Sequence, residues 1–128
     1  MQVVFHTAGL DLAVCGRILG LSVFAFFAVV IEIKENLEIL FADRPDVFIA
    51  GDLLWYPVPD RRETGPIALD VLVAFGRPKG RRGSYRQWEE GGIAPQVVFE
   101  ILSPSNSAKE MADKLAFYDH YGVEEYYL

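Results

Sequence analysis

The amino-acid sequence predicts an α/β protein of the α+β type, in which a helix, three strands, a second helix and a last strand build one mixed sheet. Three segments rich in β-forming residues follow one another at 47–58, 67–75 and 96–102. A capped helical segment that ends at a glycine comes after them. The chain has 128 residues, of which 52% are hydrophobic, so it is long and apolar enough for one domain with a buried core. This composition excludes a disordered chain.

Residues 1–45 give the weakest structural signal and are taken as an N-terminal apolar and helical segment. The run from Ile18 to Ile31 contains no charge. A membrane span takes about 20 apolar residues, whereas shorter runs are more often core segments or parts of signal peptides. Neither a basic leader nor a small-residue cleavage site accompanies the run, so we interpret it as a buried segment rather than a membrane anchor, and no membrane partner is expected. An amphipathic helix end is expected from Glu35 to Phe41, stopped before Pro45.

Two of the three predicted strands carry a single carboxylate in an otherwise apolar run. Asp70 is the only charge between Ile67 and Phe75, and Glu100 is the only charge between Gln96 and Leu102. Such apolar strands are typical of a sheet that is covered on both faces. Three consecutive strands predict an antiparallel meander, and the following helix predicts a crossover to the last strand.

The second helix has clear signals at both ends. Ser107 stands three residues before Glu110, which is the spacing of a capping box. The helix is expected to run to Tyr121, because Gly122 is a typical left-handed residue after a helix end. Residues 123–128 then begin the last strand.

Asp70 and Glu100 are the main chemical signal in the sequence. A buried carboxylate normally becomes neutral, pairs with a cation or binds a metal. Two carboxylates on neighbouring strands repel each other unless a cation lies between them, and Mg²⁺ prefers a few carboxylate oxygens plus waters. In phosphodiester hydrolysis such a metal activates water and stabilises the charge on the phosphate. The alternative is that one acid lies at a strand end or pairs with an arginine.

A basic loop interrupts a chain that is acidic as a whole. The net charge is −6, which is unusual for a nucleic-acid-binding protein. Five basic residues and no acid lie between residues 77 and 86, namely Arg77, Lys79, Arg81, Arg82 and Arg86. Beside paired carboxylates this loop would suit the phosphate backbone of DNA, with Tyr85 and Trp88 available for stacking. The alternative is a solvated loop, or one that binds an acidic partner.

Several motifs in one order then resemble the Uma-two family (Uma2), bacterial endonucleases of the restriction-endonuclease-like, PD-(D/E)XK superfamily. The resemblance covers roughly residues 45–128, so residues 46–128 are expected to form the restriction-endonuclease-like core. The motifs that carry it are Asp70, Glu100-Ile101-Leu102-Ser103-Pro104-Ser105, Lys114-x-x-x-Tyr118 and Gly122-Val123-Glu124-Glu125-Tyr126. It implies a Mg²⁺-dependent endonuclease, with Mn²⁺ as a second usable ion, that hydrolyses DNA phosphodiester bonds.

The resemblance also implies roles for individual residues. Asp70 and Glu100 would be catalytic metal ligands, and Lys114 would take the place of the family's helix lysine and orient water or neutralise phosphate charge. The alternative for Lys114 is an ordinary exposed lysine. The wider superfamily has a lysine where this chain has Leu102. Tyr118 lies one turn after Lys114, and we interpret it as a core residue with a polar tip.

The chain departs from the family pattern at three places. Leu69 stands where the family often has proline. The family's amphipathic first helix, which can supply a third acidic ligand, is not recognisable in residues 1–45, and Glu32, Glu35 and Glu38 are equal candidates to replace that ligand. The last strand is expected to be cut short at Leu128, where family members continue. An inactive remnant that binds DNA or a protein through the basic loop is therefore the alternative function.

Two further expectations concern the setting of the protein. The single cysteine, Cys15, allows no internal disulfide, which favours a reducing, cytoplasmic location. Enzymes of the superfamily often dimerise to cut two strands, so the resemblance is compatible with a homodimer and leaves the oligomeric state open.

Overall fold

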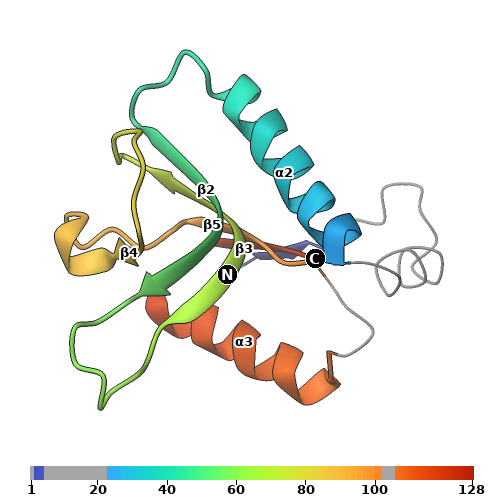
Figure 1. The fold of residues 1–128 in the computed structure, drawn as a ribbon. Helices are drawn as coiled ribbons and strands as arrows, with labels where there is room; N and C mark the ends of the chain where they lie inside the picture. Colours follow the sequence, from blue (N-terminus) through green and yellow to red (C-terminus); the bar gives the residue numbers. More distant parts are fainter. Residues whose placement is uncertain (1, 5–22, 102–105) are drawn as a thin grey trace.

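A single mixed sheet is the frame of the protein in the computed structural model, which describes residues 2–4, 23–101 and 106–128 (Figure 1). Within these residues six strands pair in the order β1-β6-β5-β3-β2-β4. The two helices of this part, α2 and α3, lie on opposite sides of the sheet (Figure 1). The protein therefore has the α+β class and the restriction-endonuclease-like arrangement that the sequence predicts.

The predicted meander and crossover are both present. β2 (Val47–Tyr56), β3 (Ile67–Phe75) and β5 (Val97–Phe99) pair antiparallel in chain order. Helix α3 (Ala108–Tyr121) then leads to β6 (Glu125–Tyr127), which pairs parallel with β5. The third strand is shorter than expected, so Glu100 follows β5 instead of lying inside it. Even so, its backbone N–H continues the ladder by donating to the carbonyl oxygen of Tyr127 at 2.8 Å.

Two short strands and a helical turn have no counterpart in the prediction. β1 (Gln2–Val4) pairs parallel with β6. β4 (Tyr85–Arg86) pairs parallel with the end of β2, and the 3₁₀ turn η1 (Gln87–Glu89) follows it directly. The expected long basic loop therefore joins the edge of the sheet at its C-terminal end, where Tyr85 and Arg86 pair with β2.

Helix α2 (Val23–Leu40) contains most of the uncharged run and the expected amphipathic helix end. Val30 is buried, and Phe26, Ile33 and Leu37 pack beside it against one sheet face, at the spacing of one helix side. The interpretation of the run as a buried segment therefore holds for one side of this helix, while residues 18–22 lie outside the described part. No helix among the described residues is long and apolar enough to cross a membrane.

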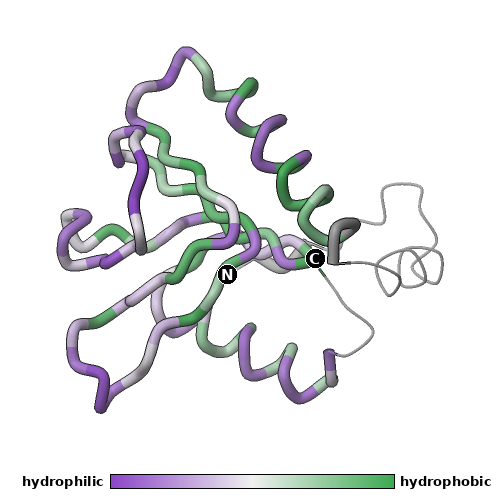
Figure 2. The backbone as a smooth tube through the Cα atoms, in the orientation of Figure 1, coloured by the Kyte–Doolittle hydropathy of each residue, from purple (hydrophilic) through white to green (hydrophobic). Residues whose placement is uncertain are grey.

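Helix α3 covers the other sheet face and has both predicted end signals. The Ser107 hydroxyl accepts a hydrogen bond from the backbone N–H of Glu110 at 3.1 Å, and the Glu110 carboxylate accepts one from the backbone N–H of Ser107 at 3.3 Å. Gly122 ends the helix with φ 101°. Hydrophobic residues gather in the strands between the helices, whereas the connecting segments are mainly hydrophilic (Figure 2). Residues 103–105 of the family motif lie outside the described residues.

The alternation of side chains changes phase in the middle of β2 and β3. Leu69 and Leu72 both belong to the core on the α3 side, although they lie an odd number of positions, three, apart in the strand. The ladder pairs Gly51 with Val71 and Leu53 with Leu69, and pairs neither Asp52 nor Asp70 between them. Asp52 has φ 49°, in the left-handed region. This break lets a strand that is otherwise apolar carry Asp70 without placing its carboxylate in either apolar layer.

Candidate active site

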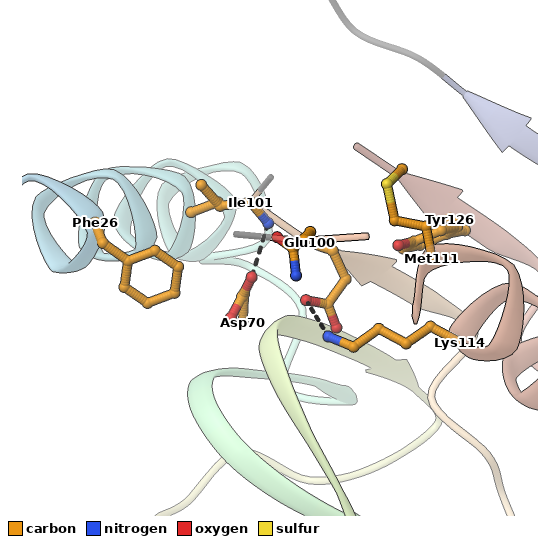
Figure 3. A pocket seen from close by; sticks show the side chains of 8 residues that line it. Phe26, Asp70, Glu100, Ile101, Met111, Lys114 and Tyr126 are labelled. Atoms are coloured by element: carbon orange, nitrogen blue, oxygen red, sulfur yellow. Dashed lines mark hydrogen bonds and ion pairs between the residues drawn. The ribbon is translucent and has the colours of Figure 1, made fainter. Parts of the chain in front are cut away.

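Three of the predicted site residues meet at one end of the sheet, each from a different element (Figure 3). β3 carries Asp70, the segment after β5 carries Glu100, and the second turn of α3 carries Lys114. Because Val71 pairs with Phe99, the antiparallel register places Asp70 opposite Glu100. The Lys114 Nζ atom lies 3.5 Å from Glu100 Oε2. Sequence positions 70, 100 and 114 are therefore brought together by the meander and the crossover helix.

The charge of Asp70 acts on the carboxyl group of Glu100, which lies opposite it in the antiparallel register. Asp70 Oδ2 accepts a hydrogen bond from the backbone N–H of Ile101 at 2.7 Å. Burial, followed by the charge of Asp70, raises the pKa of Glu100 to about 8, against the opposite effects of Tyr118 and Lys114. Without a cation, Glu100 therefore holds the proton at neutral pH.

Tyr118 is the closest partner of the buried Glu100. Its hydroxyl donates a hydrogen bond to Glu100 Oε1, and its ring is fully buried and stacked against Trp55. Burial, followed by the charge of Glu100, raises the pKa of the Tyr118 hydroxyl, so this group stays a donor. The interpretation of Tyr118 as a core residue with a polar tip is confirmed. The sequence did not indicate that the tip reaches Glu100.

The acids open into a cavity of about 180 Å³ between the two helices. Apolar side chains form much of its wall, and its lining residues are Phe26, Asp70, Glu100, Ile101, Asn106, Met111, Lys114 and Tyr126. Helix α2 contributes Phe26 to this lining, whereas the three candidate third ligands on that helix do not contribute. Glu35 and Glu38 instead lie near Lys34. Leu102, at the position of the superfamily lysine, lies outside the described residues.

The oxygen donors at this end of the sheet suit a hard divalent cation. Among the described residues no group of three or more His, Cys, Asp or Glu side chains could hold a metal ion, so the protein donors there are the two carboxylates. Mg²⁺ is commonly held by one or two carboxylates together with waters and substrate phosphates. A cation would also replace the proton that Glu100 holds at neutral pH. Asp70 and Glu100 therefore fit a hard divalent cation.

Comparison with known protein families gives a match that covers most of the chain. The model of the Uma2 family, described as "Putative restriction endonuclease", matches residues 28–128. The chain belongs to the Uma2 family. The match begins inside α2, so it includes most of that helix as well as strands β2 to β6, α3 and all three converging residues. Comparison with curated proteins and with solved structures gives no match.

Two of the five basic residues that the sequence assigned to DNA form an internal cluster in this Uma2 protein. Arg77 Nε and Arg82 Nε lie 2.8 Å and 2.6 Å from the two carboxylate oxygens of Glu90, which is buried. The Arg82 guanidinium also lies 3.9 Å from the centre of the Phe48 ring. Burial raises the pKa of Glu90, but the hydrogen bonds from Arg82 and Arg77 outweigh it and leave this pKa below its usual value. These contacts stabilise the conformation of the basic loop between Arg77 and Glu90.

The other three basic residues are all exposed and differ in their partners. Lys79 donates a hydrogen bond to the Val47 carbonyl oxygen at 3.1 Å, and Arg86 lies 3.5 Å from Glu89. Arg81 is exposed, and its side chain has no ion pair or hydrogen bond within the described part of the chain. None of the five basic residues lines the cavity. The loop leaves β3 at Gly76, six residues after Asp70 and therefore about 20 Å along the strand direction.

Sequence reasoning misjudged one aromatic residue and missed one acid near this loop. Tyr85, expected to stack on bases, is fully buried and donates a hydrogen bond to the Ile93 carbonyl oxygen at 2.7 Å, so that expectation is wrong. Trp88 is 42% exposed and remains accessible. The role of Glu90 was not anticipated, although its position just after a run of five cations without an acid was an available signal.

Proposed function

We propose that this Uma2-family protein is a metal-dependent endonuclease that hydrolyses DNA phosphodiester bonds. The observation that carries the proposal is the convergence of Asp70 and Glu100, opposite each other in the strand register, on a cavity that Lys114 also lines. A buried glutamate beside a second, partly buried acid is costly for folding, which supports a function that needs the pair. The family description supports the nuclease class, and it implies DNA as the substrate.

The side chains of the site would have different roles in catalysis. Asp70 and Glu100 would hold Mg²⁺ or Mn²⁺, with Asp70 kept in place by the backbone N–H of Ile101. When bound, the cation would supply positive charge for the phosphate and an activated water. Lys114 lies at the cavity with its side chain about one-third exposed, so its ammonium group is available to bind a phosphate oxygen. Its distance of 3.5 Å from Glu100 indicates a weak ion pair that substrate could replace.

DNA contact outside the cavity is proposed for the basic loop, and the geometry distinguishes its members. Arg81 and Arg86 face the solvent and would contact phosphates, with Lys79 beside them. Arg77 and Arg82 would act through the loop's conformation, because Glu90 already binds both. Such contacts depend on salt and carry no sequence information.

A cleavage assay on supercoiled plasmid DNA with Mg²⁺ or Mn²⁺ tests the proposal. We expect the wild type to nick or linearise the plasmid, and Asp70→Ala and Glu100→Ala each to lower the rate at least ~100-fold. Lys114→Ala should lower it less, by about 10-fold, because it removes charge without removing a ligand. Glu124→Gln, an exposed acid outside the cavity, is the matched control and should cleave at the wild-type rate.

Equal cleavage by the wild type and both alanine variants would show that any activity comes from a contaminant. DNA binding without cleavage in either metal would favour the non-catalytic alternative, in which the fold binds DNA or a protein through the basic loop.

A further inference from the structure

The two oxygens of the Glu100 carboxyl group have different partners. Oε1 accepts a hydrogen bond from the Tyr118 hydroxyl, whereas Oε2 lies 3.5 Å from Lys114 Nζ. The residue is only 6% exposed, so no bulk water competes for Oε1. Lys114 is a mobile type of side chain at the cavity, but Tyr118 is a rigid aromatic residue in the core. The two contacts therefore fix Glu100 to different degrees.

The Tyr118 hydroxyl is held in place by a stack of aromatic rings. Its ring lies 6.4 Å from the Trp55 ring at an interplanar angle of 23° and 5.1 Å from the Tyr126 ring at 61°. Trp55 is itself fully buried and donates a hydrogen bond to Gln87 Oε1 at 3.1 Å. Because tightly packed rings have few alternative rotamers, the hydroxyl stays at one position relative to the sheet.

We propose that Tyr118 is a positioning residue of the metal site, which fixes the Glu100 carboxyl group through Oε1 and leaves Oε2 as the oxygen presented to the cation. The inference rests on the proposed function. A glutamate has three side-chain torsions, and ordering them when the metal binds would weaken binding. Hydrogen bonds from residues behind the ligands remove this cost in metal sites, and their loss usually lowers metal affinity 10–100-fold.

A purely structural role for the hydroxyl predicts a different result. In that case the hydrogen bond only satisfies a buried polar group, and its loss would lower stability without changing metal affinity. Tyr85 provides the matched comparison, because it is equally buried in the same core and its hydroxyl has one acceptor, the Ile93 carbonyl oxygen. Tyr85→Phe therefore removes an equivalent hydrogen bond that does not involve Asp70 or Glu100.

Calorimetric titration of the full chain with Mn²⁺ separates the two roles. We expect Tyr118→Phe to bind Mn²⁺ 10–100-fold more weakly than the wild type, and Tyr85→Phe to bind within about twofold of it. Both variants should lose thermal stability to a similar degree. Wild-type affinity in Tyr118→Phe would overturn the inference, and so would equal losses of affinity in both variants.

A double variant tests whether Tyr118 acts through Glu100. In the Glu100→Gln background, adding Tyr118→Phe should cause no further loss of Mn²⁺ affinity, whereas a further loss of tenfold would overturn the inference. If Tyr118→Phe does not fold, Trp55→Phe replaces it, since this change keeps the hydroxyl but loosens its support. We expect an affinity between those of the wild type and Glu100→Gln, and wild-type affinity would overturn the inference.

The same titrations distinguish this inference from the proposed function. Mn²⁺ binding that is lost in Asp70→Ala but unchanged in Tyr118→Phe would overturn the positioning role alone. A wild type that binds no Mn²⁺, or whose Mn²⁺ affinity equals that of Asp70→Ala, would overturn both the positioning role and the proposed function.

Discussion

The two buried glutamates show how strongly neighbours decide the state of a carboxyl group. Glu90 lies between the guanidinium groups of Arg77 and Arg82, which lower its pKa despite burial. Glu100 faces Asp70, and burial together with that second acid raises its pKa to about 8. At neutral pH Glu90 is therefore charged and compensated, whereas Glu100 is protonated. The first acid stabilises the fold, and the second is the acid for which we propose a role in metal binding.

The lowered pKa of Glu90 predicts a pH-dependent contribution to stability. A carboxyl group whose pKa is lower in the folded state stabilises the fold above its unfolded pKa of about 4.3, and this contribution disappears as the pH falls through the folded pKa. Glu90→Gln should therefore lower the free energy of unfolding by about 3 kcal/mol at pH 7, because it leaves two arginines without their partner. Urea denaturation at pH 7, 4 and 3 should show this difference shrinking towards zero. A difference that is the same at all three values would contradict the argument.

The basic loop predicts different effects for two neighbouring arginines. Arg81→Ala should weaken binding to duplex DNA and lower the salt slope of the affinity by about 1, with unchanged stability, because Arg81 is exposed. Arg82→Ala should mainly lower the melting temperature, because Arg82 pairs with buried Glu90 and lies over Phe48. Fluorescence anisotropy with EDTA present measures binding without cleavage. Equal DNA affinity in the wild type and Arg81→Ala at low salt would remove Arg81 from the DNA surface.

At the level of the elements, the approach of α2 to the sheet depends on one glycine. A Cβ atom at Gly51 would lie 3.0 Å from Val30 Cγ1 and 3.6 Å from the Asp70 carbonyl oxygen. Gly51→Val should therefore push α2 outward and cost about 1–3 kcal/mol of stability. Gly65→Val is the control, because a Cβ atom there meets nothing within 4 Å. Thermal unfolding measures the melting temperatures of both variants. Equal values for Gly51→Val and Gly65→Val would show that α2 does not pack against Gly51 as tightly as the distance to Val30 requires.

Elements with strong local signals could be predicted from the sequence, and elements defined by distant partners could not. β2, β3 and α3 follow from apolar runs, proline and a capping box within their own segments. The three residues of β1 and the two of β4 are strands only because they pair with β6 and β2 far along the chain. The first half of α2 has no clear periodicity, since its uncharged run suits a strand as well as a helix.

The same distinction applies to the candidate site. Asp70 and Glu100 were identified because each is the only charge in an apolar segment, and Lys114 was identified by its place in the family motif. The contact of Tyr118 with Glu100 and the pairing of Glu90 with two arginines depend on how α3 and the loop pack. No local pattern encodes such contacts, because a tyrosine in an apolar helix face has the same spacing with or without a polar partner.

For the molecule as a whole, the site is built at the expense of stability. The strand register places Asp70 opposite Glu100 at the cavity between α2 and α3. Among the described residues that line this cavity, Lys114 is the single basic side chain that could compensate the two acids. A free energy of unfolding of about 5–15 kcal/mol leaves little room for such a cost. A bound cation would remove the cost, so the ranking of variants by stability should depend on whether metal is present.

Asp70→Asn should therefore be more stable than the wild type without metal and less stable with it. The asparagine keeps an oxygen that can accept from the Ile101 N–H and removes the repulsion from Glu100, which should raise stability by about 1 kcal/mol at pH 9 in EDTA. With Mn²⁺ at 100 times its dissociation constant, the wild type should gain about 2.7 kcal/mol, and the variant should gain much less because it has lost an anionic ligand. Thermal or urea unfolding under both conditions measures the reversal. The same order in EDTA and in Mn²⁺ would mean that the acid pair does not form a cation site, whereas a reversal would show that metal binding and folding are coupled through these two residues.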